Sequence, residues 1–147
     1  MNKQEVLNKI TSIGIVPVVR IADGAQVLDA AEALMAGGVS IMEVTMSSTR
    51  PFEIIEKLKA KYGDKLLVGL GSVLNDKVAE KGVDAGAEFI VSPIFDESIL
   101  KVAQKYEKAA ILGSLTPTEI QHSFSAGTDV VKVFPATKFG PGYFKDI

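Results

Sequence analysis

The chain of 147 residues has no cysteine and only one histidine, His122. It therefore cannot form disulfides, zinc–thiolate sites or a thiol nucleophile, and a transition-metal site is not expected. No segment reaches the roughly 18 apolar residues of a membrane-spanning helix, and the N-terminus lacks a signal-peptide pattern. The formal net charge of −2 gives no general attraction to nucleic acid or anionic membranes. We therefore expect a soluble, cytoplasmic protein without nucleic-acid or membrane partners and without a metal.

Short, continuously apolar segments alternate with longer amphipathic ones along the chain. The apolar segments predict β-strands at residues 15–20, 40–46, 66–73, 88–93, 109–114 and 129–135. The amphipathic segments predict helices at 24–38, 50–63, 76–86, 96–107 and 116–127, with the beginning of another at 140–147. Continuously apolar strands are typical of parallel sheets covered by helices, so we expect an α/β fold of six βα units in one domain, residues 1–147.

Two architectures fit this alternation: a (β/α) barrel and an open, doubly wound sheet. The dinucleotide-binding pattern G-x-G-x-x-G after the first strand would favour the open sheet, and it is absent there. The nearest match, GLGSVL at residues 69–74, has only the first two glycines and follows the third predicted strand. The strongest argument for a nucleotide-binding open sheet is therefore missing.

Three of the predicted strands carry a charged side chain toward their C-terminal ends. Lys132 lies in the sixth strand, Glu43 in the second and Arg20 at the end of the first. Side chains alternate between the two faces of a strand, so each charge shares a face with apolar or polar residues such as Thr45, and the opposite face is wholly apolar. In a barrel the apolar face would meet the helices. The mixed face would then point inward near the mouth, where barrel enzymes have their active sites.

These three side-chain types suit Schiff-base chemistry. A lysine in an apolar site is favoured in its neutral form, and a neutral amine can attack a ketone. The iminium that forms is an electron sink for breaking a C–C bond, a carboxylate such as Glu43 can move the protons, and an arginine can hold a substrate carboxylate. The pattern also leaves open a buried Lys132–Glu43 ion pair with no chemistry.

Six segments together resemble the 2-keto-3-deoxy-6-phosphogluconate (KDPG) aldolases, a family that also includes 4-hydroxy-2-oxoglutarate (KHG) aldolases. They are VPVVR (16–20), AEALMAGGVSIMEVT (31–45), VGLGSVLN (68–75), DAGAEFIVSP (84–93), LTPTEI (115–120) and AGTDVVKVFPA (126–136). They occur in the family's order and spacing, and the resemblance covers about residues 13–147.

The resemblance implies a (β/α)8 TIM barrel and a metal-independent class I lyase of carbohydrate metabolism, in the Entner–Doudoroff pathway. It makes Lys132 the Schiff-base lysine and Glu43 the general acid and base, with no cofactor. The products would be pyruvate and either glyceraldehyde 3-phosphate or glyoxylate. It also implies a homotrimer acting on a small 2-keto acid. Residues expected to contact the substrate are Ser72, near the pyruvyl carboxylate, Pro93 and Phe134, which wall the pyruvyl pocket, and Thr116, in a loop on the active face.

The sequence departs from the family pattern in two places. Many members carry an arginine after the second strand, where this chain has Ser47 in the segment TMSST, residues 45–49. Arg20 or Arg50 would have to compensate, and Arg20 is expected because related sequences also end the first strand in arginine. We further expect a C-terminally truncated form of a protein of roughly 200 residues, because only six of eight βα units are present. The first and sixth strands would then be open edges.

Two other functions remain open from the sequence. One is another phosphate-binding β/α-barrel enzyme, such as an epimerase or an enzyme of the thiamine-phosphate-synthase type, which needs no central lysine. The other is an inactive fragment that associates with itself through its exposed strand edges.

Overall fold

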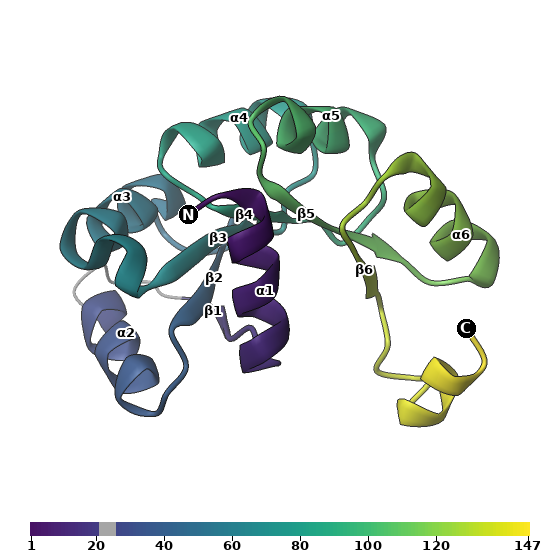
Figure 1. The fold of residues 1–147 in the computed structure, drawn as a ribbon, viewed down its shortest axis with the longest axis horizontal. Helices are drawn as coiled ribbons and strands as arrows, with labels where there is room; N and C mark the ends of the chain where they lie inside the picture. Colours follow the sequence, from purple (N-terminus) through teal and green to yellow (C-terminus); the bar gives the residue numbers. More distant parts are fainter. Residues whose placement is uncertain (21–25) are drawn as a thin grey trace.

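Six parallel strands form one continuous sheet in the computed structural model, which describes residues 1–20 and 26–147 (Figure 1). The strands are β1 (Val18–Val19), β2 (Ile41–Thr45), β3 (Leu67–Gly71), β4 (Phe89–Val91), β5 (Ala109–Ser114) and β6 (Val130–Val133). Their order in space, β1-β2-β3-β4-β5-β6, is their order along the chain. A doubly wound sheet reverses its strand order at a switch point. The sequential order therefore rules out that alternative and confirms the barrel-type α/β fold.

The helices that connect successive strands lie around the outside of the curved sheet (Figure 1). They are α2 (Gln26–Ala36), α3 (Pro51–Tyr62), α4 (Asp76–Asp84), α5 (Glu97–Lys105) and α6 (Pro117–Ala126). Each corresponds to a predicted helix, although the first two residues of the one predicted at 24–38 lie outside the described residues. None of the described helices is long and apolar enough to cross a membrane.

Two predicted elements differ from the structure. The strand predicted at residues 15–20 contains only Val18 and Val19, because Pro17 has no N–H to donate to a ladder. The Pro17 carbonyl still accepts a hydrogen bond from the Glu43 N–H at 2.9 Å, so the segment follows β2 without full pairing. The segment predicted to begin a helix at 140–147 forms a short 3₁₀ helix, η2 (Pro141–Lys145).

A helix that the sequence reasoning did not predict, α1 (Lys3–Ile13), lies on the concave side of the sheet (Figure 1). It begins with a capping box, in which the Asn2 side chain accepts from the Glu5 N–H and the Glu5 carboxylate accepts from the Asn2 N–H. It ends at Gly14, whose φ of 72° is a left-handed conformation that glycine adopts without strain.

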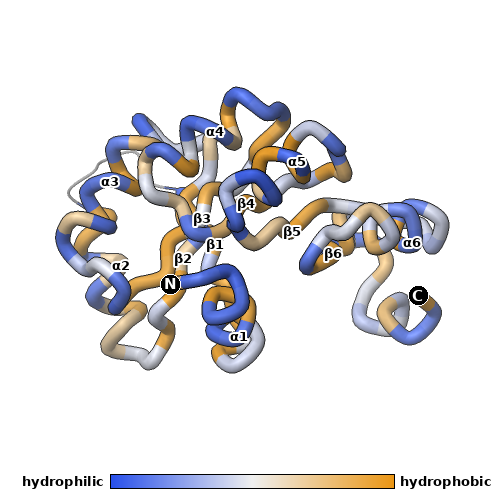
Figure 2. Tube along the Cα trace, turned by 45° about the horizontal axis from the view of Figure 1, so that its top comes forward, coloured by the Kyte–Doolittle hydropathy of each residue, from blue (hydrophilic) through white to orange (hydrophobic). Residues whose placement is uncertain are grey.

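The sheet separates two apolar clusters. On the outer side, residues such as Met42, Val44 and Leu70 pack against the connecting helices. On the inner side, α1 covers the sheet, and the buried residues there are Val6, Ile10, Ile41, Leu67, Phe89, Val91, Ala109 and Ile111. Figure 2 shows β5 largely in the hydrophobic colour, whereas the helices carry both colours, as amphipathic helices do.

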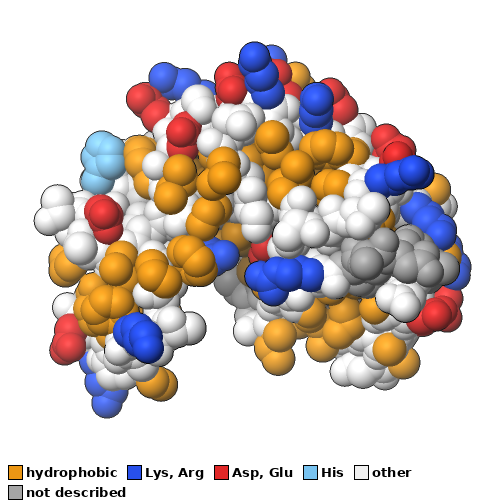
Figure 3. Space-filling model, turned by 180° about the vertical axis from the view of Figure 1, so that it is seen from behind, with side chains coloured by type: hydrophobic (Ala, Val, Ile, Leu, Met, Phe, Trp, Pro, Cys, Tyr) orange, Lys and Arg blue, Asp and Glu red, His pale blue; other side chains and the backbone are white. Residues whose placement is uncertain are grey.

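Both edge strands of the sheet are open. No described residue pairs β1 with β6, and apolar side chains beside them remain in solvent. Val18 is 45% exposed and Phe134 is 44% exposed, and Phe139 and Phe144 after β6 are exposed as well. Figure 3 shows the molecule hollowed between the C-terminal segment and the rest, with hydrophobic side chains on either side. The open edges expected from the sequence are therefore present in the described chain.

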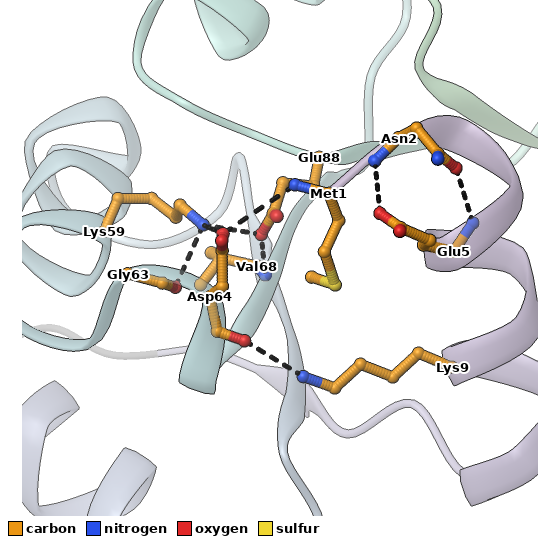
Figure 4. A network of polar contacts seen from close by, with 9 residues as sticks. All are labelled: Met1, Asn2, Glu5, Lys9, Lys59, Gly63, Asp64, Val68 and Glu88. Carbon is orange, nitrogen blue, oxygen red and sulfur yellow. Dashed lines mark hydrogen bonds and ion pairs between the residues drawn. The ribbon is translucent and has the colours of Figure 1, made fainter.

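A polar network ties α1 to the end of the sheet opposite the mouth (Figure 4). The Lys59 ammonium donates to the buried Glu88 carboxylate at 2.8 Å, and the same carboxylate oxygen accepts from the Val68 N–H at 3.2 Å. Asp64, in the short helix η1 (Gly63–Lys65), lies 3.9 Å from the Lys59 ammonium and 3.8 Å from the amino group of Met1. Lys9 of α1 donates to the Asp64 carbonyl at 3.4 Å, so the network joins α1, α3 and β3.

Replacing Glu88 with alanine is expected to lower the free energy of unfolding by about 2–3 kcal/mol, because it leaves the Val68 N–H and the Lys59 ammonium without their buried acceptor. Urea denaturation measures the change. Glu80→Ala is the matched control, since the Lys105–Glu80 pair is solvent-exposed at 3.4 Å and should contribute under about 1 kcal/mol. Equal losses in the two variants would contradict a structural role for the buried pair.

Candidate active site

The strand register places the three charged residues on the inner face of the sheet. Val18 lies opposite Glu43, and the residue two positions before Glu43, Ile41, belongs to the inner cluster. Arg20 follows Val18 by two residues and so has the same direction. Ile111 of the inner cluster pairs with Val130, two residues before Lys132. Glu43 of β2, Lys132 of β6 and Arg20, which follows β1, therefore extend toward one space.

Glu43 is almost completely buried at 4% exposure. Its carboxylate lies over Gly71 of β3, and a Cβ atom built on Gly71 would overlap Oε1 of Glu43. The missing side chain of Gly71 thus makes the space in which the carboxylate rests. Gly69 has the same relation to Phe89, whose ring fills the space above it. Glycines inside apolar strands often mark such close approaches, and this was the signal available in the sequence.

Electrostatic interactions connect Glu43 with Lys132 and Arg20. Burial raises the pKa of the Glu43 carboxyl above its ordinary value, and the positive charges of Lys132 and, to a lesser extent, Arg20 oppose that rise. Neither cation lies within 4.0 Å of the carboxylate oxygens, since no such ion pair joins these described residues. The structure therefore does not contain the contact Lys132–Glu43 ion pair that the sequence left open. The charges interact through space, around a carboxyl suited to proton transfer.

The raised pKa of Glu43 predicts a pH-dependent cost to stability. Between the unfolded and folded pKa values the folded chain holds the Glu43 proton more tightly, so the free energy of unfolding falls as pH rises through that window. Glu43→Gln cannot ionise, so its stability relative to the unchanged chain should improve as pH rises from about 4 to neutrality. Urea denaturation across this range measures the difference, and a difference that does not vary with pH would contradict the prediction.

Lys132 is half-buried, and its neighbour across the sheet is Gly113 of β5. A Cβ atom built on Gly113 would overlap the Pro93 carbonyl, so the loop after β4 crosses directly over this part of the sheet. The Lys132 ammonium lies 4.9 Å from the centre of the Phe134 ring. Pro93 and Phe134, both expected at the pyruvyl pocket, line one cavity beside the lysine.

The other predicted site residues lie at the same edge of the sheet with different surroundings. Thr45 is buried, and its hydroxyl is 2.6 Å from that of Ser47, which is exposed in the turn after β2. Ser72 follows β3 with a φ of 60°, a left-handed conformation that is uncommon for serine. Thr116 caps α6, where its hydroxyl accepts from the Glu119 N–H. These four residues thus lie at the C-terminal ends of β2, β3 and β5, or in the segments that follow them.

The two arginines considered for the substrate carboxylate differ clearly. Arg20 acts electrostatically on Glu43, whereas Arg50 is exposed at the beginning of α3 and lies 3.4 Å from the Glu53 carboxylate. The geometry therefore favours Arg20. Among residues 1–20 and 26–147, no group of three or more histidine, aspartate or glutamate side chains could hold a metal ion.

Comparisons with known proteins agree with this arrangement. The family model for "KDPG and KHG aldolase" matches residues 6–145. The 2-dehydro-3-deoxy-phosphogluconate aldolase of Zymomonas mobilis is 35% identical over 126 residues, which cover 86% of this chain and 60% of that protein. The KHG/KDPG aldolase of Escherichia coli K12 is 33% identical over 131 residues, which cover 89% of this chain and 61% of that protein.

A solved structure extends the comparison to three dimensions. It is a KDPG aldolase from Legionella pneumophila, with pyruvate captured at low pH as a covalent carbinolamine intermediate. It superposes with a TM-score of 0.83 at 32% identity, and the match covers 89% of this chain and 64% of that one. The chain spans about 60% of the length of the curated relatives that it matches. Because the family model includes all six strands and every charged residue of the site, the chain belongs to the KDPG and KHG aldolase family.

Proposed function

We propose that the protein is a class I aldolase that cleaves KDPG to pyruvate and glyceraldehyde 3-phosphate, or 4-hydroxy-2-oxoglutarate to pyruvate and glyoxylate. The observation that carries the proposal is the convergence of Lys132, Glu43 and Arg20 on the inner face, with the buried Glu43 carboxyl held at a raised pKa. A nucleophilic amine, a proton carrier and a carboxylate-binding cation are the groups that this reaction needs.

In the proposed reaction, the neutral Lys132 amine attacks the C2 ketone of the substrate to give a carbinolamine, which loses water to form an iminium ion. Glu43, acting through a water molecule, accepts the proton of the C4 hydroxyl. The C3–C4 bond then breaks, its electron pair moves into the iminium group, and the aldehyde leaves. Glu43 returns a proton to C3 of the enamine, and water hydrolyses the pyruvate imine, which frees Lys132.

The proposed contacts hold the pyruvyl part of the substrate. Arg20 binds the carboxylate with Ser72, and Thr45 and Ser47 supply hydroxyls on the same side. Pro93 and Phe134 form the apolar wall beside Lys132, and Thr116 lies on the rim. The covalent pyruvate intermediate of the related aldolase from Legionella pneumophila supports a Schiff base on Lys132 without a cofactor. We also propose that the protein is cytoplasmic. We propose further that it forms a homotrimer, and sedimentation would test this oligomeric state.

The decisive experiment is borohydride reduction in the presence of pyruvate. Hydride reduces the imine to a secondary amine, so intact-mass spectrometry should show the mass of one pyruvate minus water plus two hydrogens. Peptide mapping should place the adduct on Lys132. A steady-state assay with KDPG and with 4-hydroxy-2-oxoglutarate then ranks the two substrates. If pyruvate leaves no adduct while the chain is folded, the proposal fails.

A further inference from the structure

One tyrosine connects the chain that follows β6 with the turn that follows β5. After β6 the chain leaves the sheet and ends in η2 (Figure 1). The hydroxyl of Tyr143 in η2 donates a hydrogen bond to the Leu115 carbonyl at 2.7 Å. Among residues 1–20 and 26–147, this is the only side-chain hydrogen bond that joins residues 136–147 to another part of the chain. The position of η2 therefore depends strongly on this hydroxyl group.

The turn after β5 is held by two side chains. Leu115 is the first residue of this turn, and its N–H donates to the Glu119 carboxylate of α6 at 2.9 Å. The next N–H, that of Thr116, donates to the same carboxylate oxygen at 2.8 Å. The Leu115 carbonyl accepts from Tyr143. Both backbone polar groups of Leu115 thus have partners, one on α6 and the other on η2.

This turn forms part of the pocket proposed for the pyruvyl group. Leu115 lines the same cavity of about 430 Å³ as Pro93 and Phe134, the two apolar walls beside Lys132. The Phe134 ring lies 4.9 Å from the Lys132 ammonium. A movement of the chain around Phe134 would therefore change the surroundings of the proposed nucleophile.

Residues 134–143 are attached to the end of β5 at both of their ends. At the first end, the Phe134 N–H donates to the Ser114 carbonyl at 3.0 Å. At the other end, the Tyr143 hydroxyl donates to the Leu115 carbonyl. Loss of the second attachment would leave the segment held through Phe134 alone, so the freedom of the segment would reach the wall of the pocket.

We propose that Tyr143 is a positioning residue of the Schiff-base reaction. Its hydrogen bond to Leu115 holds the segment after β6 against the turn after β5, and this keeps Phe134 in place beside Lys132. The inference rests on the proposed function, because the wall matters only if pyruvate binds at Lys132. Geometry at a reacting centre has large effects on rate, since a displacement of about 1 Å can cost about 10²-fold.

Tyr143→Phe removes the hydroxyl and keeps the ring. The Tyr143 ring packs within its own segment against the ring of Phe139, with the ring centres 4.9 Å apart. A phenylalanine retains this contact. The matched control is Tyr106→Phe, which removes a hydroxyl at the opposite end of β5, where the Tyr106 ring lies 4.7 Å from the Lys105 ammonium.

The first measurement is borohydride trapping over a range of pyruvate concentrations. In Tyr143→Phe the half-saturating pyruvate concentration should rise about three- to tenfold, the effect of one lost hydrogen bond. Tyr106→Phe should leave it unchanged. A merely structural role would give a different result, because loss of folded protein lowers the final amount of adduct without changing the half-saturating concentration.

The second measurement does not involve pyruvate. Lys138 is exposed within the segment, and trypsin cleaves after lysine. Cleavage of a folded chain follows the population of the locally open form, so Tyr143→Phe should be cut after Lys138 about three- to tenfold faster. Intact-mass spectrometry detects the loss of residues 139–147, and Tyr106→Phe should be cut at the original rate.

The two measurements distinguish failure of this inference from failure of the aldolase proposal. If the unchanged chain forms no pyruvate adduct, the aldolase proposal fails and the positioning role loses its basis. If the unchanged chain forms the adduct and Tyr143→Phe has the same half-saturating concentration, only the positioning role is overturned, even where tryptic cleavage is faster. Unchanged cleavage would also overturn it, because the hydrogen bond would then not hold the segment.

Discussion

Lys132→Met is expected to abolish the pyruvate adduct formed with borohydride and to reduce cleavage of either keto acid at least about 10⁴-fold. Methionine keeps the length and apolar character of the side chain but has no amine, so neither the carbinolamine nor the iminium can form. The variant should remain folded, because Lys132 is half-buried and makes no ion pair within 4.0 Å in the described chain. Mass spectrometry and a coupled pyruvate assay measure both effects.

Lys101→Met is the control for this variant. Lys101 lies on α5, is 70% exposed and pairs with Glu97 one turn away, so its loss should leave trapping and cleavage unchanged. Loss of the Lys132 charge also removes the main attraction that opposes the rise in the pKa of Glu43. The pH dependence of stability should therefore extend to higher pH in Lys132→Met. Cleavage that persists in this variant would point to one of the barrel enzymes that need no central lysine.

Gly71→Ala is expected to have the second-largest effect, although Gly71 contributes no chemical group. A methyl group there would occupy the space of the Glu43 carboxylate, so the carboxylate or the strand must move. Misplacing the proton carrier should reduce cleavage by about 10²–10⁴-fold, the usual contribution of general acid–base catalysis. Crowding at a fully buried site should also lower the free energy of unfolding by about 1–3 kcal/mol.

The matched control for this substitution is Gly142→Ala. A Cβ atom there meets nothing within 4 Å and the backbone is not left-handed, so the added methyl should change neither cleavage nor stability. The pH dependence of the free energy of unfolding tests the position of Glu43 independently. If Gly71→Ala displaces the Glu43 carboxylate from its buried place, burial should no longer raise its pKa to the same extent. If Gly71→Ala retains both full cleavage and the original pH dependence, Glu43 is not held as the structure indicates.

The sequence was sufficient to predict the sheet and the direction of the charged side chains. Alternation within strands depends only on backbone geometry, and the register of β2 and β6 confirms the inner positions of Glu43 and Lys132. The short length of β1 was harder to predict from the sequence. The segment at residues 15–20 has the apolar character of a strand, but Pro17 has no N–H to donate to the sheet. Helix α1 had a readable signal in the Asn2–Glu5 capping box and the spacing of Val6 and Ile10.

Other parts of the site depend on neighbours that are distant in the sequence. The space that Gly71 leaves for the Glu43 carboxylate depends on two neighbouring strands, β2 and β3. The sequence also could not distinguish two roles for Thr116. A threonine before a predicted helix is expected both when it caps the helix and when it contacts substrate, and the structure shows the cap. Whether the predicted residues bind substrate stays a prediction until the trapping and mutational experiments are done.

The position of α1 has a consequence for folding kinetics. Val6 and Ile10 bury their side chains against Ala109 and Ile111, which lie far along the chain and are synthesised after them. Contacts between such distant parts of a chain form slowly, because a long loop must close before they stabilise anything. The apolar face of α1 therefore stays uncovered until β5 has been synthesised, and we expect α1 to pack onto the sheet later than the helices that connect neighbouring strands.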